Sequence, residues 1–361
     1  MEKKYDWKLK DTELDLDSFK YPLDRLRKKV KRVEFMEKQI EKKCLDLVEN
    51  YRILAEGNKM EFSEMILACA GLYLAAGVHP DMVKVQECKK LLKSKAGIFS
   101  NFRGSDELLV RCKMALAVDL DLYFENVEGE YQRLKSFFSG EQTVLAAMIL
   151  AEQRVSAESQ ADKTKLIYKE MKEAHPWLTS ESDLPFAALM AVSGRDASTV
   201  YEEAEEIFAL LKNNKLRADK NTLQMLSHIL AIRKGSAEEK SNKLCALATG
   251  LKEAGHSLGT GSRLAILGIL ADSGLPTDLL VDRICETDDF LKQYKPFRGI
   301  FSVGKDCRRM FAVQMVQSSL SNEESLSTSA LMSASVELAI ITMILMMIVV
   351  SSTASYHTGS H

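Results

Sequence analysis

The stretch VLAAMILA at residues 144–151 decides the fold, because a similar apolar run returns three more times along the chain. The later runs are FAALMA at 186–191, QMLSHILA at 224–231 and LAILGILA at 264–271. Their closing Leu-Ala or Met-Ala pairs lie 40 residues apart, and a Leu-Lys or Met-Lys pair follows each one after 21 residues. A fixed period of this length is typical of proteins built from stacked structural repeats.

Each period has the pattern of a helical hairpin. Its first helix is short and apolar on all sides, so it must be buried, whereas its second helix is amphipathic. Two looser copies end at Leu74-Ala75 and Leu116-Ala117, and SAEE at 236–239 has the pattern of a capping box. The sequence therefore predicts an all-α protein of tandem hairpins of about 40 residues, similar to an α-solenoid and curved or closed on itself.

The chain of 361 residues is longer than the size at which a single core usually stops growing. We expect three parts from the pattern. Residues 1–60 form a helical extension, 61–320 form the hairpin repeats, and 321–361 form a polar linker, an apolar final helix and a disordered end.

Composition restricts the partners and the compartment. A formal net charge of −2 provides no basic field, so we expect no nucleic-acid partner. The seven cysteines are widely spaced and contain no C-x-x-C pair, which argues against a disulfide framework and a zinc knuckle. Reduced cysteines and a charged, non-signal N-terminus favour a cytoplasmic protein.

Two segments carry unusual patterns. RLRKKVKR at 25–32 is either a phosphate- or membrane-binding patch or a solvated helix face, and we favour the helix face. In the tail, residues 338–350 carry no charge but span only about 20 Å as a helix, short of the ~30 Å hydrocarbon core. Extension to residues 331–354 allows a membrane-associated protein, but we favour a helix buried in the array or in an oligomer.

The stretch MKEAHPWLTSESDLPFAALMA at 171–191 concentrates residue types that occur in active sites. A structural role explains them equally well. His175 ends one helix before Pro176, Ser182 or Asp183 caps the next helix, and Trp177 packs with Leu178 to close an apolar corner. We therefore expect this stretch to be a junction between hairpins.

His228 is the best candidate partner for a site at this junction, because histidine is uncommon inside an apolar helix. Its equivalents one or two periods away include Ala188 and Gly268, which leave room for an imidazole ring or a small ligand. A metal-binding or hydrolytic site built from His175, Asp183 and His228 is thus the catalytic alternative. The sequence contains no established catalytic motif, so we predict no cofactor and do not expect an enzyme.

The segments at 171–191 and 221–230 resemble the most recognisable parts of an uncharacterised bacterial family, domain of unknown function 4003 (DUF4003). The resemblance extends over roughly residues 20–320. It implies a bacterial, cytosolic, helical protein, but it supplies no activity and no catalytic residue. The tail is richer in Ile and Met than the small-residue tail associated with that family.

We expect the molecule to act as a non-catalytic scaffold that binds a protein or peptide, since stacked hairpins usually offer an extended binding surface. The second hypothesis is the enzyme or metal site of His175, Asp183 and His228. The third is a regulator tethered to a membrane through its C-terminal helix.

Overall fold

The computed structural model describes residues 38–97, 100–104, 106–152, 157–214, 216–299 and 302–321. The chain divides into two units, Met1–Gln39 and Ile40–His361, and the helices below belong to the larger unit. The basic stretch at 25–32 and the apolar tail lie outside the described residues. Within the described residues, no helix is long and apolar enough to cross a membrane.

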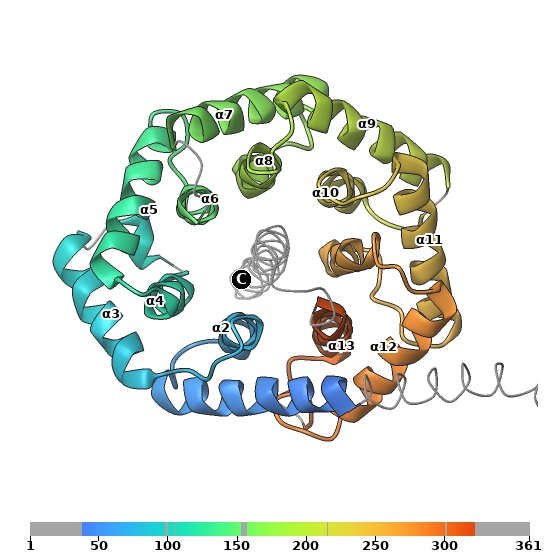
Figure 1. Ribbon diagram of the computed structural model, residues 1–361, viewed down its shortest axis with the longest axis horizontal. Coiled ribbons are helices and arrows are strands. Elements are labelled where there is room, and N and C mark those ends of the chain that lie inside the picture. The colour runs from blue at the N-terminus through green and yellow to red at the C-terminus, as the bar shows by residue number, and fades with distance from the viewer. Residues whose placement is uncertain are drawn as a thin grey trace, which may run out of the picture. The chain divides into compact units, whose positions relative to one another are not determined.

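Among the described residues, seven helices form the inner layer of the larger unit, where Figure 1 shows them end-on, and all but α13 are short. The chain runs through them in this order: α2 (Ser63–Ala75), α4 (Glu107–Leu116), α6 (Gln142–Ala151), α8 (Leu184–Ala191), α10 (Lys220–Ala231), η3 (Ser262–Leu270) and α13 (Lys305–Ser321).

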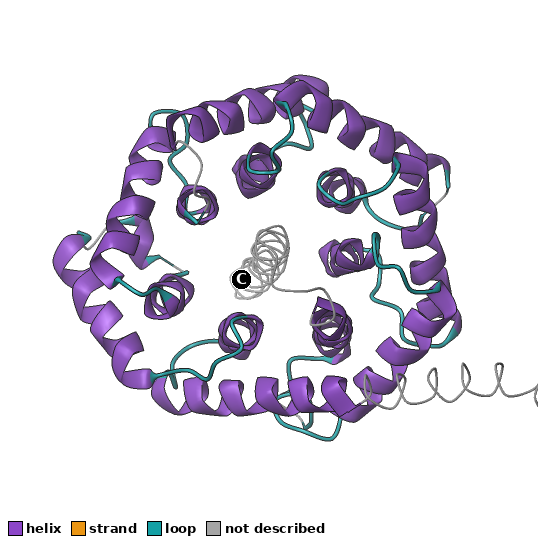
Figure 2. Cartoon of the chain, in the orientation of Figure 1, coloured by secondary structure: helices purple, strands orange, loops and turns teal. Residues whose placement is uncertain are grey.

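Longer amphipathic helices form the outer layer and run around the inner one (Figure 1). They are helical residues 40–57, α3 (Met82–Lys95), α5 (Leu120–Lys135), α7 (Ala157–Ala174), α9 (Ala197–Asn213), α11 (Ala237–Glu253) and α12 (Thr277–Leu291). Figure 2 shows that helices and loops account for all the coloured chain, and short 3₁₀ turns occur at Asn101–Arg103 (η1) and Glu181–Asp183 (η2). The predicted all-α class is confirmed.

The inner helices of the larger unit pack side by side in chain order, and the last one meets the first. Gly71 of α2 lies so close to α13 that a Cβ there would sit 3.2 Å from Gln314 Nε2 and 3.5 Å from the Phe311 ring. Outer helices pack chiefly on the inner helix that follows them in the chain, as α5 does on α6 and α9 on α10. The hairpin pattern had suggested that each outer helix packs chiefly on the inner helix before it, to which a short turn joins it. The structure instead shows the following inner helix as the main packing partner.

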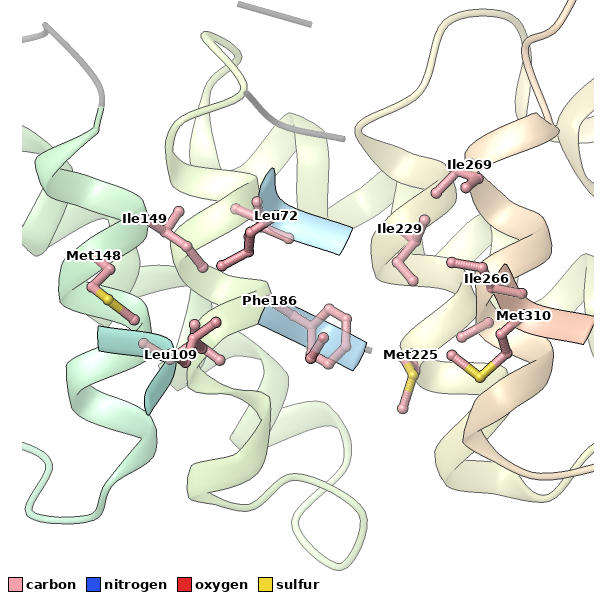
Figure 3. Packing of buried hydrophobic residues seen from close by; sticks show 14 of the residues in the cluster. Leu72, Leu109, Met148, Ile149, Phe186, Met225, Ile229, Ile266, Ile269 and Met310 are labelled. Atoms are coloured by element: carbon pink, nitrogen blue, oxygen red, sulfur yellow. The ribbon is translucent and has the colours of Figure 1, made fainter. Parts of the chain in front are cut away.

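The core lies among the inner helices. Figure 3 shows side chains from all of them gathered in one apolar region, including Leu72, Leu109, Phe186, Ile229 and Met310. All five are at most 3% exposed. Helices that are apolar on every side can pack in this position because outer helices cover one flank and neighbouring inner helices cover two more.

Helical residues 40–57 also belong to this packed unit. Cys44, Leu47 and Leu54 are fully buried in its core. The sequence pattern had placed this segment in a separate extension because its apolar residues are spaced as on an outer helix and follow no recognisable inner helix.

Lysines on three of the outer helices, α3, α7 and α11, donate hydrogen bonds to the next turn along the chain. Lys84 Nζ donates to the carbonyl of Ala117 at 2.8 Å, Lys163 donates to Arg195 O, and Lys243 donates to Leu275 O at 2.8 Å. These acceptors belong to turns that follow inner helices, where carbonyl groups lack partners within the helix.

Several local predictions can be checked directly. The inner helices α6, α8 and α10 end at the predicted alanines. Ser236 Oγ accepts from Glu239 N, and the Glu239 carboxylate accepts from Ser236 N at 3.0 Å, which forms the predicted capping box. Residues Ser262–Leu270 differ, since they form a 3₁₀ helix in which Gly268 packs against Ile229.

Candidate functional site

The connection between α7 and α8 contains His175, the first predicted site residue. Its backbone N–H donates to Met171 O at 2.9 Å, and Pro176 then prevents the helix from continuing. Its Nε2 lies 2.9 Å from Glu205 Oε2 on α9, and its ring centroid lies 5.0 Å from that of Phe208. His175 therefore joins the end of α7 to α9.

Asp183 lies at the N-cap position of α8, just before Pro185. Its carboxylate accepts from Ser180 N at 2.8 Å and from Ser180 Oγ at 3.4 Å. Burial raises the pKa of this carboxyl to about 6, although the hydrogen bonds from Ser180 and the charge of Lys172 oppose the shift. The carboxylate thus orders the corner, and its hydrogen bonds are local to it.

Thr179 connects the same corner to α10. Its hydroxyl donates to Met171 O at 3.0 Å and accepts from Gln224 Nε2 at 3.0 Å, and both side chains are buried. Trp177 was expected to close the apolar corner, and this prediction is wrong because the side chain is 97% exposed. Thr179 and its polar contacts hold the corner, so the tryptophan is left at the surface.

His228 on α10 is almost fully buried, at 1% exposure. Its ring centroid lies 5.8 Å from that of Phe186, and neither ring nitrogen has a hydrogen-bond partner. Burial, assisted by the nearby charge of His175, lowers the pKa of His228 to about 3, so the imidazole is neutral at pH 7. Two unpartnered buried nitrogens carry a desolvation cost, which makes His228 the least satisfied polar group of the three.

The side chains of His175 and Asp183 have separate hydrogen-bonding partners, and the ring of His228 has none. Among the described residues, no hydrogen bond or ion pair joins His175, Asp183 and His228 to one another. The charge of His175 lowers the pKa of His228, but no hydrogen bond joins the two side chains.

A different group has ligand atoms close enough for a metal ion: His256, Asp288 and Asp289, within 4.8 Å of one another. Asp288, however, is 1% exposed and already bound by cations. Its Oδ1 accepts from Arg308 Nε at 2.6 Å, its Oδ2 lies 2.9 Å from His256 Nδ1, and Arg309 Nε is 3.6 Å away. Two guanidinium groups repel a cation, so this group is an ion-pair hub between α12 and α13. The sequence analysis missed this hub because its histidine and its second arginine, His256 and Arg309, are 53 positions apart.

The surface carries a second feature, which we call the turn patch: Val78, Val83, Val118 and Leu122. These side chains are 50%, 70%, 103% and 54% exposed and lie in the turns after α2 and α4 or at the starts of α3 and α5. The bond from Lys84 to Ala117 O joins the start of α3 to the turn after α4. The turn patch thus comprises four exposed apolar side chains in the turn regions of two successive helix pairs.

Exposed apolar residues are confined to one half of the described chain. Residues 38–177, the first half, hold every large apolar side chain that is exposed in the described chain, and residues 178–320, the second half, hold none. Besides the turn patch, the exposed group comprises Leu45, Met60, Phe62, Phe137, Leu166 and Trp177. The sequence analysis missed this surface because the period of apolar runs identifies buried residues, whereas these residues lie between the runs.

Comparison with known proteins provides a family but no activity. The family model for a protein of unknown function, DUF4003, matches residues 50–348. The uncharacterized protein YeaA of Bacillus subtilis (strain 168) is 24% identical over 200 residues, which cover 52% of this chain and 58% of that relative. The match thus spans less than two thirds of the relative's length, and no solved structure matches. The chain belongs to the DUF4003 family of proteins of unknown function.

Proposed function

We propose that this protein is a non-catalytic binding protein whose turn patch contacts another protein. The supporting observation is the confinement of exposed apolar side chains to the first half. Clustered apolar residues at a surface are typical of interaction sites, whereas single ones need no explanation. The seven free cysteines support a cytoplasmic setting for this function.

The proposed contact surface can be compared with equivalent positions in the second half, aligned on the helix N-caps. The second residue after the N-cap is Val83 in α3 but Ser198 in α9 and Glu238 in α11. The third residue after the N-cap is Leu122 in α5 but Glu239 in α11. The same backbone positions therefore accept polar residues, so folding does not require the apolar ones in the first half.

The test uses those second-half residues as substitutions. Tagged wild-type protein and the Val83→Glu/Leu122→Glu variant are purified from cells of the source organism, and the co-purified proteins are quantified by mass spectrometry. Loss of two central apolar contacts is expected to reduce a specific partner at least about tenfold. The control is Ser198→Glu/Thr199→Glu, which adds the same charges at the start of α9 and should retain the partner.

Three results would contradict the proposal. One is the absence of any partner that the first-half variant loses and the control keeps. Another is a wild-type dimer that the first-half variant dissociates, because the turn patch would then bind a second copy. The last is patch-dependent binding to lipid vesicles without a protein partner.

The catalytic alternative has one observation in its favour, the two unpartnered nitrogens of buried His228. It requires His175 and Asp183 to leave Glu205 and Ser180, their present partners. Calorimetric titration with Zn²⁺ tests the metal version of this alternative. Stoichiometric binding that His228→Leu abolishes would support it, and equal binding by the variant would exclude His228 as a ligand.

A further inference from the structure

A groove separates the outer helices α11 and α12 in the second half, far along the chain from the turn patch. Its volume is about 680 Å³, which lies in the range of ligand-binding pockets. Small side chains line this space, among them Ala246 and Thr249 of α11 and Ala254 at its C-cap. The two helices approach closely at Gly250, where a Cβ would lie 2.8 Å from Val281 Cγ2.

Two of the small residues that line the groove have larger equivalents on α9. Forty residues earlier, α9 has Glu206 in place of Ala246 and Leu210 in place of Gly250. Leu210 packs partly against the core, so the corresponding position on α9 is filled. The groove therefore depends on the side chains of α11 and does not follow from the helix arrangement alone.

The charged side chains at the rim of the groove are all acidic. Glu253, Asp278 and Asp282 line it, and none of the described residues that line it is a lysine, arginine or histidine. No salt bridge to another described residue occupies these three carboxylates. Asp278 and Asp282 are one helical turn apart, which puts both on the same side of α12.

The acidic rim continues along α12 beyond the groove. Glu286 and Asp289 are also exposed and follow Asp282 at helical spacing, whereas Arg283, the single arginine of this helix, is 4% exposed. A ligand lying along the groove would thus meet carboxylates over three turns of α12.

From this geometry we propose that the α11–α12 groove binds a cationic, amphipathic helical segment of a partner protein. The small apolar side chains of α11 receive the apolar face of that segment, and its Lys or Arg residues, spaced four apart, pair with Asp278 and Asp282. This is the binding mode of an amphipathic helix in a groove, with orientation set by complementary charge at the rim. It is a second contact site, independent of the turn patch.

The experiment measures binding of a fluorescent synthetic peptide to the purified full-length chain by polarisation. The peptide is a helix of Ala and Leu on one face with Lys at every fourth position, and its matched peptide has Gln in place of Lys. Saturable binding is expected for the Lys peptide. The Gln peptide should bind at least about tenfold more weakly, because it has no cations to pair with Asp278 and Asp282.

Two variants locate the binding. Asp278→Asn/Asp282→Asn should weaken the Lys peptide about 5- to 20-fold, whereas Glu202→Gln/Glu206→Gln on α9 removes the same charge and should change affinity less than about twofold. Ala246→Leu fills the groove without changing charge and should also weaken binding. Circular dichroism and thermal unfolding check that each variant is folded.

The proposal is overturned by equal binding of the two peptides, or by equal losses in the α9 and α12 variants, which would indicate general attraction to an acidic protein. It is also overturned by no saturable binding up to about 1 mM peptide. Because the assay uses a purified protein with an intact turn patch, its failure would leave the Val83→Glu/Leu122→Glu result unaffected.

Discussion

The two halves of the described chain share a helix arrangement but differ in what they expose. Val118 precedes the N-cap of α5, and Arg195 occupies the equivalent position before α9, where it donates to Ala231 O at 2.8 Å. In the first half the residue at this position, Val118, exposes an apolar side chain to solvent. In the second half Arg195 links two turns by its hydrogen bond. The comparison shows that surface chemistry varies independently of the packing pattern.

Buried ionic ties are prominent in the second half. Lys240 is 1% exposed and donates to Glu203 and, at 3.0 Å, to Arg233 O. Arg233 in turn pairs with Asp272 at 2.5 Å. These ties link successive turns of the second half. The first half has a similar tie, since Lys113 is 6% exposed and pairs with Glu152 at 2.6 Å, so the two halves differ in the apolar side chains that they expose.

The largest effect should come from breaking such a tie. Glu203→Gln leaves the Lys240 ammonium buried without its carboxylate, and we expect a loss of about 3 kcal/mol in the free energy of unfolding. Urea unfolding measures it, with the exposed neighbour Glu202→Gln as control, expected within about 0.5 kcal/mol of wild type. Equal, small effects of the two variants would show that the tie does not stabilise the second half.

His228→Leu tests the buried imidazole of the second half through pH. The unfolded histidine takes up a proton below pH 6.5, whereas the folded one stays neutral down to about pH 3, so wild-type stability falls as pH drops through this window. The leucine variant lacks this loss, and its advantage should grow by about 2 kcal/mol between pH 8 and pH 5. Parallel pH profiles in urea unfolding would contradict the burial of a neutral His228.

Asp183→Asn should show the opposite pH dependence. The folded carboxyl binds a proton below about pH 6 and the unfolded one only below 3.8, so wild-type stability falls as pH rises through this window. Between pH 5 and pH 6 wild type should lose about 1 kcal/mol relative to the asparagine variant. A constant difference between the two proteins over this interval would show that Asp183 is not desolvated.

The smallest stability effect is expected in the turn patch itself. Val83→Glu and Leu122→Glu replace exposed side chains at helix starts, where a carboxylate interacts favourably with the helix dipole. Each should change the free energy of unfolding by less than about 0.5 kcal/mol. A larger loss in urea unfolding would mean that these residues support the fold, which would remove them as a surface free for binding.

Much of the fold could be predicted from the sequence because buried apolar helices leave a strong and local signal. The runs ending at Ala151, Ala191 and Ala231 are inner helices, and the capping box at Ser236 forms as expected. The sequence left open whether the array is curved or closed on itself, since this depends on the contact between Gly71 and α13, over 200 residues away in sequence.

The candidate site was harder to predict because side-chain pairing is set by tertiary contacts. Nothing in the stretch at 171–191 indicates that His175 pairs with Glu205, 30 positions away. The burial of His228 followed from its apolar surroundings, but its lack of hydrogen-bond partners required the structure. Exposure of Trp177 was missed because aromatic residues at helix junctions are usually assumed to pack.

The central proposal, a protein-binding surface confined to the first half, is tested most directly by photo-crosslinking in living cells. A photoreactive amino acid is placed at Val83 and, in a separate strain, at Ser198, the same position in the second half. We expect Val83 to give a crosslinked species heavier than the 40.4 kDa chain that contains a different protein, and Ser198 to give none. Equal adducts from both positions, adducts with a second copy of the chain, or no adduct from Val83 would contradict the proposal.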